Sequence, residues 1–92
     1  MSVFVDSETL TISTVALGLT AAKVARSDFA GVFLYCEGSV RYWTSGKVPT
    51  STEGIPLDDG KERTLSIAEA TYFKAIRSGG TDAKLHVQYL KS

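Results

Sequence analysis

The stretch "GVFLYCEGSVRYWT", Gly31–Thr44, contains two apolar runs separated by a short segment with a glycine. Side chains of a β-strand alternate between its two faces, so both faces of the first run are apolar. Those faces are Val32, Leu34 and Cys36 on one side, and Phe33 and Tyr35 on the other. Such a strand is central in a sheet, or is covered on its second face. The segment Glu37–Val40 is typical of a tight turn, so the sequence predicts a β-hairpin over Gly31–Thr44.

Further strands are indicated along the chain by period-two alternation and by turn residues between the runs. The expected strands are Ser2–Asp6, Thr9–Thr14, Arg63–Ala68, Tyr72–Ser78 and Ala83–Leu90. A second hairpin turn is expected over Ser78–Ala83, where Gly79 and Gly80 lie. Short strands with glycine-rich turns predict one all-β domain over residues 1–92, a small β-sandwich or β-barrel of antiparallel strands.

Two segments allow finer predictions. The run Thr14–Ser27 has near-helical apolar spacing, but Gly18 and its β-branched residues favour a turn near Gly18 and a strand over Ala21–Ala25. Ser66 and Glu69 have capping-box spacing, which allows one short helical turn. The expected core consists of Leu10, Ile12, Val32, Leu34, Leu65, Ile67, Phe73, Ile76, Leu85 and Val87.

Composition excludes several classes of partner and site. The ten Lys and Arg balance ten Asp and Glu, so no clustered positive charge is expected to bind nucleic acid. The most apolar window, Val15–Ala25, is interrupted by Thr20 and Lys23, which argues against a membrane span. One Cys and one His give neither a disulfide nor a metal site. A domain this small has little stability to spare, so we expect association with other chains and homo-oligomer formation.

Few residues are candidates for catalysis. His86 lies on the polar side of an alternating strand, and Cys36 shares a face with core residues, so both are expected to be structural. Asp58 and Asp59 precede Gly60, which is typical of a turn rather than a cation site. The sequence therefore predicts no enzyme, no catalytic residues and no cofactor. The rival hypothesis is a small hydrolase or thiol enzyme that uses His86 or Cys36.

Adjacent aromatic residues mark the predicted strand that begins at Val40. Tyr42 and Trp43 point to opposite faces, so one joins the core and the other lies on the second face or the surface. An exposed aromatic there would stack on a sugar or anchor a protein contact. The expected partner-binding residues are Trp43, Lys47, Pro49, Thr50 and Phe4.

The run "VRYWTSGKVPTSTEGIPLDDG" resembles a pattern of small bacteriophage virion proteins. The matching motifs are Val40–Tyr42, Gly46–Thr50 with Gly54, Pro56–Gly60, Phe73–Arg77 and Val87–Tyr89. The segment "ISTVALGLTAAKVA" resembles the N-terminal strand and turn of the same group. The resemblance implies a β-sandwich structural subunit of a virion, such as a capsid decoration protein or another head or tail accessory protein. Its partners would be other virion proteins, and it would be made in the host cytoplasm.

A second resemblance competes with the first. The spacing of Tyr42, Gly46, Pro49 and Thr50 is similar to a strand–loop element in immunoglobulin-like accessory domains of chitinolytic and other secreted enzymes. Those domains usually have Asp before the glycine, whereas this chain has Ser45. The alternative function is therefore an immunoglobulin-like carbohydrate-binding accessory module.

Overall fold

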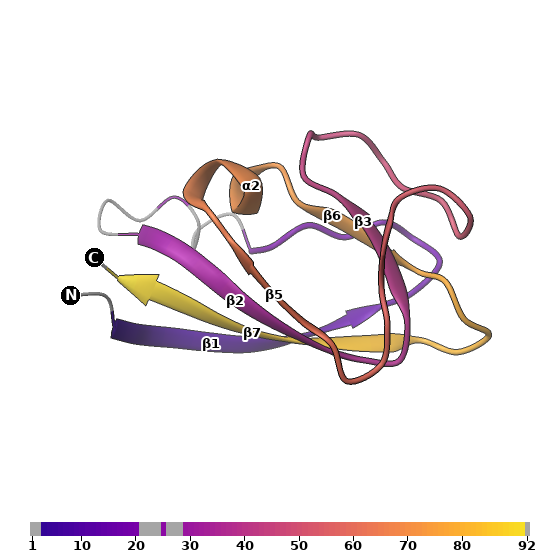
Figure 1. The fold of residues 1–92 in the computed structure, drawn as a ribbon, viewed down its shortest axis with the longest axis horizontal. Coiled ribbons are helices and arrows are strands. Elements are labelled where there is room, and N and C mark those ends of the chain that lie inside the picture. Colours follow the sequence, from indigo (N-terminus) through magenta and orange to yellow (C-terminus); the bar gives the residue numbers. More distant parts are fainter. Residues whose placement is uncertain (1–2, 21–24, 26–28, 92) are drawn as a thin grey trace.

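The computed structural model describes residues 3–20, 25 and 29–91, with the backbone alone for residues 3–5 and 29. The described residues form two open antiparallel sheets, with strand orders β1-β7-β2-β5 and β4-β3-β6, and one short helix (Figure 1). The elements are β1 (Val3–Ile12), β2 (Phe29–Glu37), β3 (Val40–Trp43), β4 (Ile55–Leu57), β5 (Glu62–Leu65), α2 (Ile67–Thr71), β6 (Lys74–Arg77) and β7 (Ala83–Lys91). The predicted all-β fold is confirmed, and the two sheets form a small β-sandwich rather than a closed barrel.

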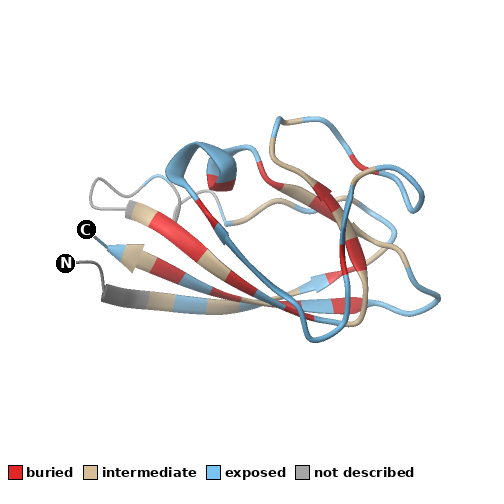
Figure 2. Ribbon diagram, viewed as in Figure 1, coloured by how far each residue is buried: buried red, intermediate tan, exposed pale blue. Residues whose placement is uncertain are grey.

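The core lies between the two sheets, where buried residues of the facing strands meet (Figure 2). Strand β7 alternates as predicted, with Leu85 and Val87 buried and Lys84 and Gln88 exposed. Strand β2 is central as predicted, because it pairs with β7 on one side and β5 on the other. The buried core residues are Ile12, Val32, Leu34, Cys36, Val40, Tyr42, Leu57, Leu65, Ala70, Phe73, Ala75, Ala83, Leu85, Val87 and Tyr89.

Both predicted hairpins are wrong, and for the same reason. The turn at Glu37–Val40 joins β2 of the four-stranded sheet to β3 of the three-stranded sheet, and Ser78–Ala83 joins β6 back to β7. The two corners pack against each other: the Ser78 amide donates to the Ser39 carbonyl at 2.9 Å. Gly38 has φ = +93°, and an added Cβ would lie 3.0 Å from the Ala83 Cβ, so a side chain here would be both strained and crowded. A tight turn with glycine serves a corner as well as a hairpin.

Three predicted core positions differ from the structure. Ile67 is 50% exposed, because Ser66 starts α2 and directs Ala70 inward instead. Ile76 is half-buried on the outer face of its sheet, because Ala75 is the residue of β6 that enters the core. Leu10 is only partly buried and packs against the edge of the core. The capping box itself is confirmed: the Ser66 hydroxyl accepts from the Glu69 amide at 3.3 Å, and the Glu69 carboxylate accepts from the Ser66 amide at 2.9 Å.

The segment after β1 joins the three-stranded sheet. Leu17 and Ala75 exchange two backbone hydrogen bonds of 2.9 and 3.0 Å, which cover part of the outer edge of β6. The chain bends at Thr14 and Val15 rather than near Gly18 as predicted. At Gly18 an added Cβ would lie 2.9 Å from the Phe73 carbonyl oxygen, so the glycine serves a close approach instead of a turn. The strand predicted over Ala21–Ala25 falls mainly outside the described residues. We call the three-stranded sheet, α2 with its C-cap residue Tyr72, and residues 13–20 the second layer.

Candidate functional site

The outward side of the four-stranded sheet carries a mixed aromatic and polar surface. We define its central residues, Ser7, Thr9, Phe33, Tyr35, His86 and Gln88, as the open face. The strand register places them in two rows. Phe33, Gln88 and Ser7 form one row, and Tyr35, His86 and Thr9 form the next.

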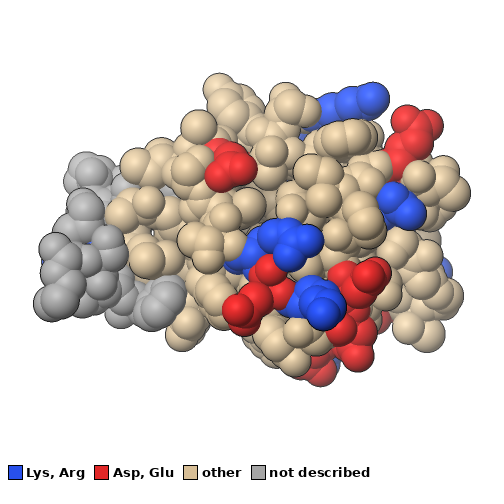
Figure 3. Space-filling view, in the orientation of Figure 1, with Lys and Arg blue, Asp and Glu red and all other residues tan. Residues whose placement is uncertain are grey.

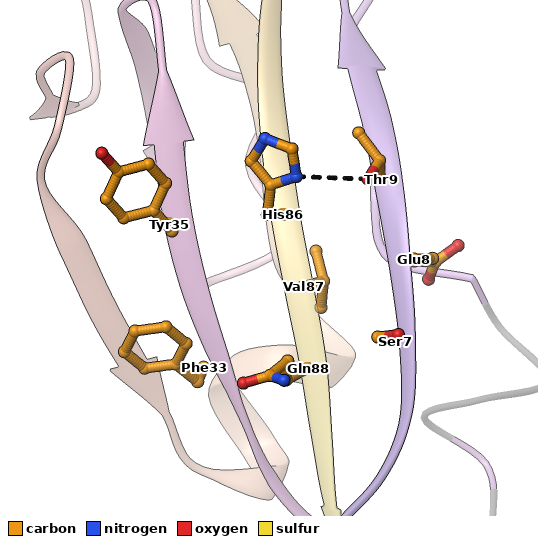
Figure 4. Close-up of a pocket in the computed structure, with 8 residues that line it drawn as sticks. All are labelled: Ser7, Glu8, Thr9, Phe33, Tyr35, His86, Val87 and Gln88. Atoms are coloured by element: carbon orange, nitrogen blue, oxygen red, sulfur yellow. Dashed lines mark hydrogen bonds between the residues drawn. The ribbon is translucent and has the colours of Figure 1, made fainter.

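These side chains line a shallow depression of about 360 Å³ (Figure 4). Phe33 and Tyr35 project from β2, Gln88 and His86 from β7, and Ser7 and Thr9 from β1. Tyr35 is 39% exposed, and its ring centroid lies 6.2 Å from that of His86 at a tilt of 44°. The depression therefore has aromatic rings on one side and hydroxyl groups on the other.

A hydrogen-bonded chain of three side chains crosses the open face. The Thr9 hydroxyl lies 3.2 Å from His86 Nδ1, and His86 Nε2 contacts the Glu37 carboxylate. All three side chains are substantially exposed to solvent. With both ring nitrogens engaged, the imidazole is fixed in place on the sheet.

The same trio contains a hydroxyl, an imidazole and a carboxylate, the groups of a nucleophilic triad. The rival hydrolase hypothesis required His86 beside a Ser and an acid, and His86 does lie beside Glu37 with Ser7 in the same depression. Such chemistry also needs donors aimed at a developing oxyanion. Strand β7 is paired on both sides, so its amides lie in the plane of the sheet and do not point over its face. The backbone of β7 therefore supplies no donor over the depression, and the Gln88 side-chain amide is the donor that lines it beside His86.

Cys36 cannot act with His86, because the two side chains lie on opposite faces of the sheet. The thiol is buried in the core, as predicted, and its Sγ lies 3.5 Å from the Gly38 carbonyl oxygen. Burial, reinforced by the negative charges of Asp59 and Asp58, raises the pKa of Cys36 to about 11. The thiol is therefore protonated at neutral pH and is a weak nucleophile.

The loop between β3 and β4 folds back over the outer face of the three-stranded sheet. Pro49 is fully buried there, and Gly54 lies against both Pro49 and Arg41. The Arg41 guanidinium donates to the Gly54 carbonyl at 2.9 Å, which ties the end of the loop to β3. The loop is therefore an ordered cover for this sheet.

The structure does not bring the residues expected to bind a partner together: four lie at or within this loop, and Phe4 lies on β1 of the other sheet. Trp43 is half-buried, and Lys47 Nζ lies 5.4 Å from its ring centroid. The buried indole N–H finds no acceptor among the described residues. Thr50 is exposed, and its hydroxyl accepts from the Glu53 amide at 2.9 Å. Phe4 pairs with Leu90 at the end of β1, and its side chain is outside the described part of the structure.

A second depression, also of about 360 Å³, lies beside this loop. It is lined by Thr14, Pro49, Thr50, Ser51, Ile76, Arg77 and Gly79. Its only charged lining group, Arg77, is paired with Asp82 at 2.7 Å. The guanidinium is therefore already neutralised from within the chain.

Large exposed apolar side chains are concentrated in the second layer and in the loop attached to it. Among the described residues these are Val15, Leu17, Val48, Ile55, Ile67 and Tyr72, and Tyr35 is the exception on the four-stranded sheet. In the view of Figure 3, charged side chains gather mainly over β5 and the turn before it, and much of the surface near α2 is uncharged. This side of the molecule offers apolar contact area.

Sequence reasoning found part of the open face. It placed Phe33 and Tyr35 on the second face of a central strand, and His86 on the polar side of β7. It missed Ser7 and Thr9 as neighbours of His86, because the only signal for them is the register between β1 and β7. That register joins residues that are far apart in the sequence.

The chain matches no protein-family model, no curated protein and no solved structure. Among the described residues, no group of three or more His, Cys, Asp and Glu side chains could hold a metal ion. The helical part of the described chain contains no segment with the length and apolarity needed to cross a membrane.

Proposed function

We propose that this protein is a non-enzymatic structural subunit of a bacteriophage particle, a capsid decoration protein or another head or tail accessory protein. It acts by binding other virion proteins and copies of itself. The observation that carries the proposal is the set of exposed apolar side chains in the second layer. Exposed apolar side chains gathered on one layer supply the kind of contact area that sites for other proteins use.

The second layer also has the rigidity that a protein interface needs. Tyr72 is 58% exposed, and its carbonyl accepts from the Gly46 amide at 3.2 Å, which joins the end of α2 to the loop. Pro49 anchors the same loop in a buried position. A surface fixed before binding loses little conformational entropy when a partner docks.

The choice of partner follows from the resemblance of the loop and its flanking strands to small virion proteins. The absence of an enzyme activity is supported by the protonated Cys36 thiol and by the in-plane amides around His86. Virion proteins act in many copies on a protein lattice, so a modest contact area on each subunit suffices through multivalency.

The test combines particle analysis with one pair of variants. Mass spectrometry of purified phage particles should detect the protein, and sedimentation equilibrium should show self-association of the wild type at high concentration. Ile67→Lys and Tyr72→Lys should reduce both association and particle incorporation, because each places a charge on exposed apolar surface. Lys84→Glu, on the opposite sheet, is the matched control. A protein that is monomeric at high concentration and absent from particles would contradict the proposal.

A further inference from the structure

The two sheets differ in how their outer faces are covered. The loop between β3 and β4 covers the outer face of the three-stranded sheet and buries Pro49 there. On the four-stranded sheet, no described segment crosses the open face, and Tyr35 and Gln88 remain exposed. The open face thus keeps the Tyr35 ring exposed within a polar surface, on the side of the molecule opposite the second layer.

The arrangement of the rings is regular. Phe33 and Tyr35 occupy alternate positions of β2, so they project from the same side about 7 Å apart along the strand. Tyr35 carries its hydroxyl toward Gly60, where a Cβ would lie 3.9 Å from the Tyr35 oxygen. This leaves ring faces beside the depression and a polar group at its rim.

The polar groups of the open face are predominantly uncharged. Gln88 offers an amide, Ser7 and Thr9 offer hydroxyls, and His86 is fixed between Thr9 and Glu37. Together they supply both donors and acceptors. Three carboxylates lie in or beside the depression: Glu8 lines it and is hydrogen-bonded to Thr20 and Tyr89, Glu37 contacts the imidazole, and Glu62 is the cross-strand neighbour of Tyr35. The carboxylates disfavour an anionic ligand, and the uncharged donors and acceptors suit a ligand that is rich in hydroxyl groups.

We propose that the open face binds a short neutral saccharide. Sugar rings have apolar C–H faces that stack on aromatic side chains, and hydroxyl groups that pair with amides, hydroxyls and imidazoles. A depression of about 360 Å³ lies within the size range of small-molecule sites. The depression is shallow and open, so we expect a dissociation constant of roughly millimolar.

The experiment is an amide NMR titration of the ¹⁵N-labelled protein with maltose, cellobiose, lactose and N,N′-diacetylchitobiose. At least one disaccharide should give saturable shifts centred on the amides of Phe33, Tyr35, His86 and Gln88. Tyr35→Ala and Gln88→Ala should each weaken this binding about tenfold, because one removes the stacking ring and the other an exposed polar partner. Both side chains are exposed, so both variants should retain the wild-type fold.

Tyr72→Ala is the matched control, because it removes an exposed tyrosine from the second layer and should leave saccharide binding unchanged. The inference is overturned by an absence of saturable shifts with all four sugars, by unchanged affinity in Tyr35→Ala, or by shifts centred on Trp43. It is also overturned if Tyr35→Ala abolishes self-association, which would make the open face a protein interface. Failure of particle incorporation would leave the saccharide result unaffected, so this inference and the proposed function fail separately.

Discussion

Replacing Gly54 with alanine should release the loop that covers the three-stranded sheet. Gly54 has φ = +138°, a conformation that residues with a side chain rarely adopt. An added Cβ would lie 3.1 Å from the Arg41 Cβ, 3.2 Å from the Tyr42 amide nitrogen and 3.3 Å from the Pro49 Cβ. Two of these neighbours belong to β3 and the third is the buried anchor of the loop, so the added methyl group acts on all three at once.

The expected loss can be worked from two contributions. Forcing a side chain into this backbone region costs of order 1–3 kcal/mol, and crowding a packed site costs a similar amount. A backbone shift that relieves the strained conformation also relieves part of the crowding, so the two costs do not add fully. We therefore expect Gly54→Ala to lower the free energy of unfolding by about 2–4 kcal/mol. A domain of this size has about 5–15 kcal/mol in total, so the change is a large share of its stability.

Urea unfolding followed by tryptophan fluorescence measures this loss directly. Trp43 is the only tryptophan, and it lies at the start of the loop in question. Gly80→Ala is the matched control, because Gly80 has no positive φ and an added Cβ would meet nothing within 4 Å. The control should stay within about 1 kcal/mol of the wild type, with an unchanged m value. Equal midpoints for Gly54→Ala and Gly80→Ala would refute the conformation and contacts assigned to the loop.

Three further predictions concern the core, the thiol and the helix. Leu34→Ala should cost about 2–5 kcal/mol of unfolding free energy because Leu34 is fully buried, whereas Val15→Ala, at 73% exposure, should be nearly neutral in the same urea experiment. Burial raises the pKa of Cys36 to about 11, so at pH 7 its reaction with a disulfide reagent such as DTNB should be limited by the rate at which the protein unfolds locally or globally. Rapid labelling of the native state would contradict the burial of the thiol. Ser66→Ala should cost about 1 kcal/mol through loss of the helix cap, as read from the unfolding midpoint. The Ser66 amide and hydroxyl lower the pKa of Glu69, so the carboxylate stabilises the fold at pH values above its unfolded pKa. This stabilisation is lost as the pH falls through the lower pKa of the folded state. A stability difference between the wild type and Ser66→Ala that grows on acidification through this range would contradict the assignment.

Local patterns in the sequence predicted local features well. Alternation along Ala83–Leu90 assigned each side chain of β7 to its face, because side-chain direction in a strand depends only on position. The capping box at Ser66 was found because its two partners lie three residues apart. The apolar run of β2 indicated its central place in the sheet, where it pairs with β7 and β5, although its second face lies on the open face.

Features that depend on strand pairing were not predictable in the same way. The turn at Glu37–Val40 has the composition of a hairpin, and only the packing of Gly38 against Ala83 identifies it as a corner between sheets. The open face also depends on contacts between residues that are distant in the sequence: His86 is separated by 49 residues from Glu37 and by 77 from Thr9. Such neighbours follow from the register of distant strands, which a single sequence does not specify.

The covering loop accounts for the division of the molecule into two different surfaces. A sandwich of two sheets has two outer faces, and each is solvent-exposed unless another segment packs on it. Here the loop between β3 and β4 packs on one face and brings Val48 to the surface beside the second layer, which adds apolar area where other apolar side chains are already exposed. The other face keeps polar side chains around Phe33 and Tyr35, which suits a hydroxyl-rich ligand better than a second protein. Releasing the loop through Gly54 should therefore weaken assembly while it leaves the open face intact, because β1, β7 and β2 make no hydrogen-bonded pair with β3 or β4.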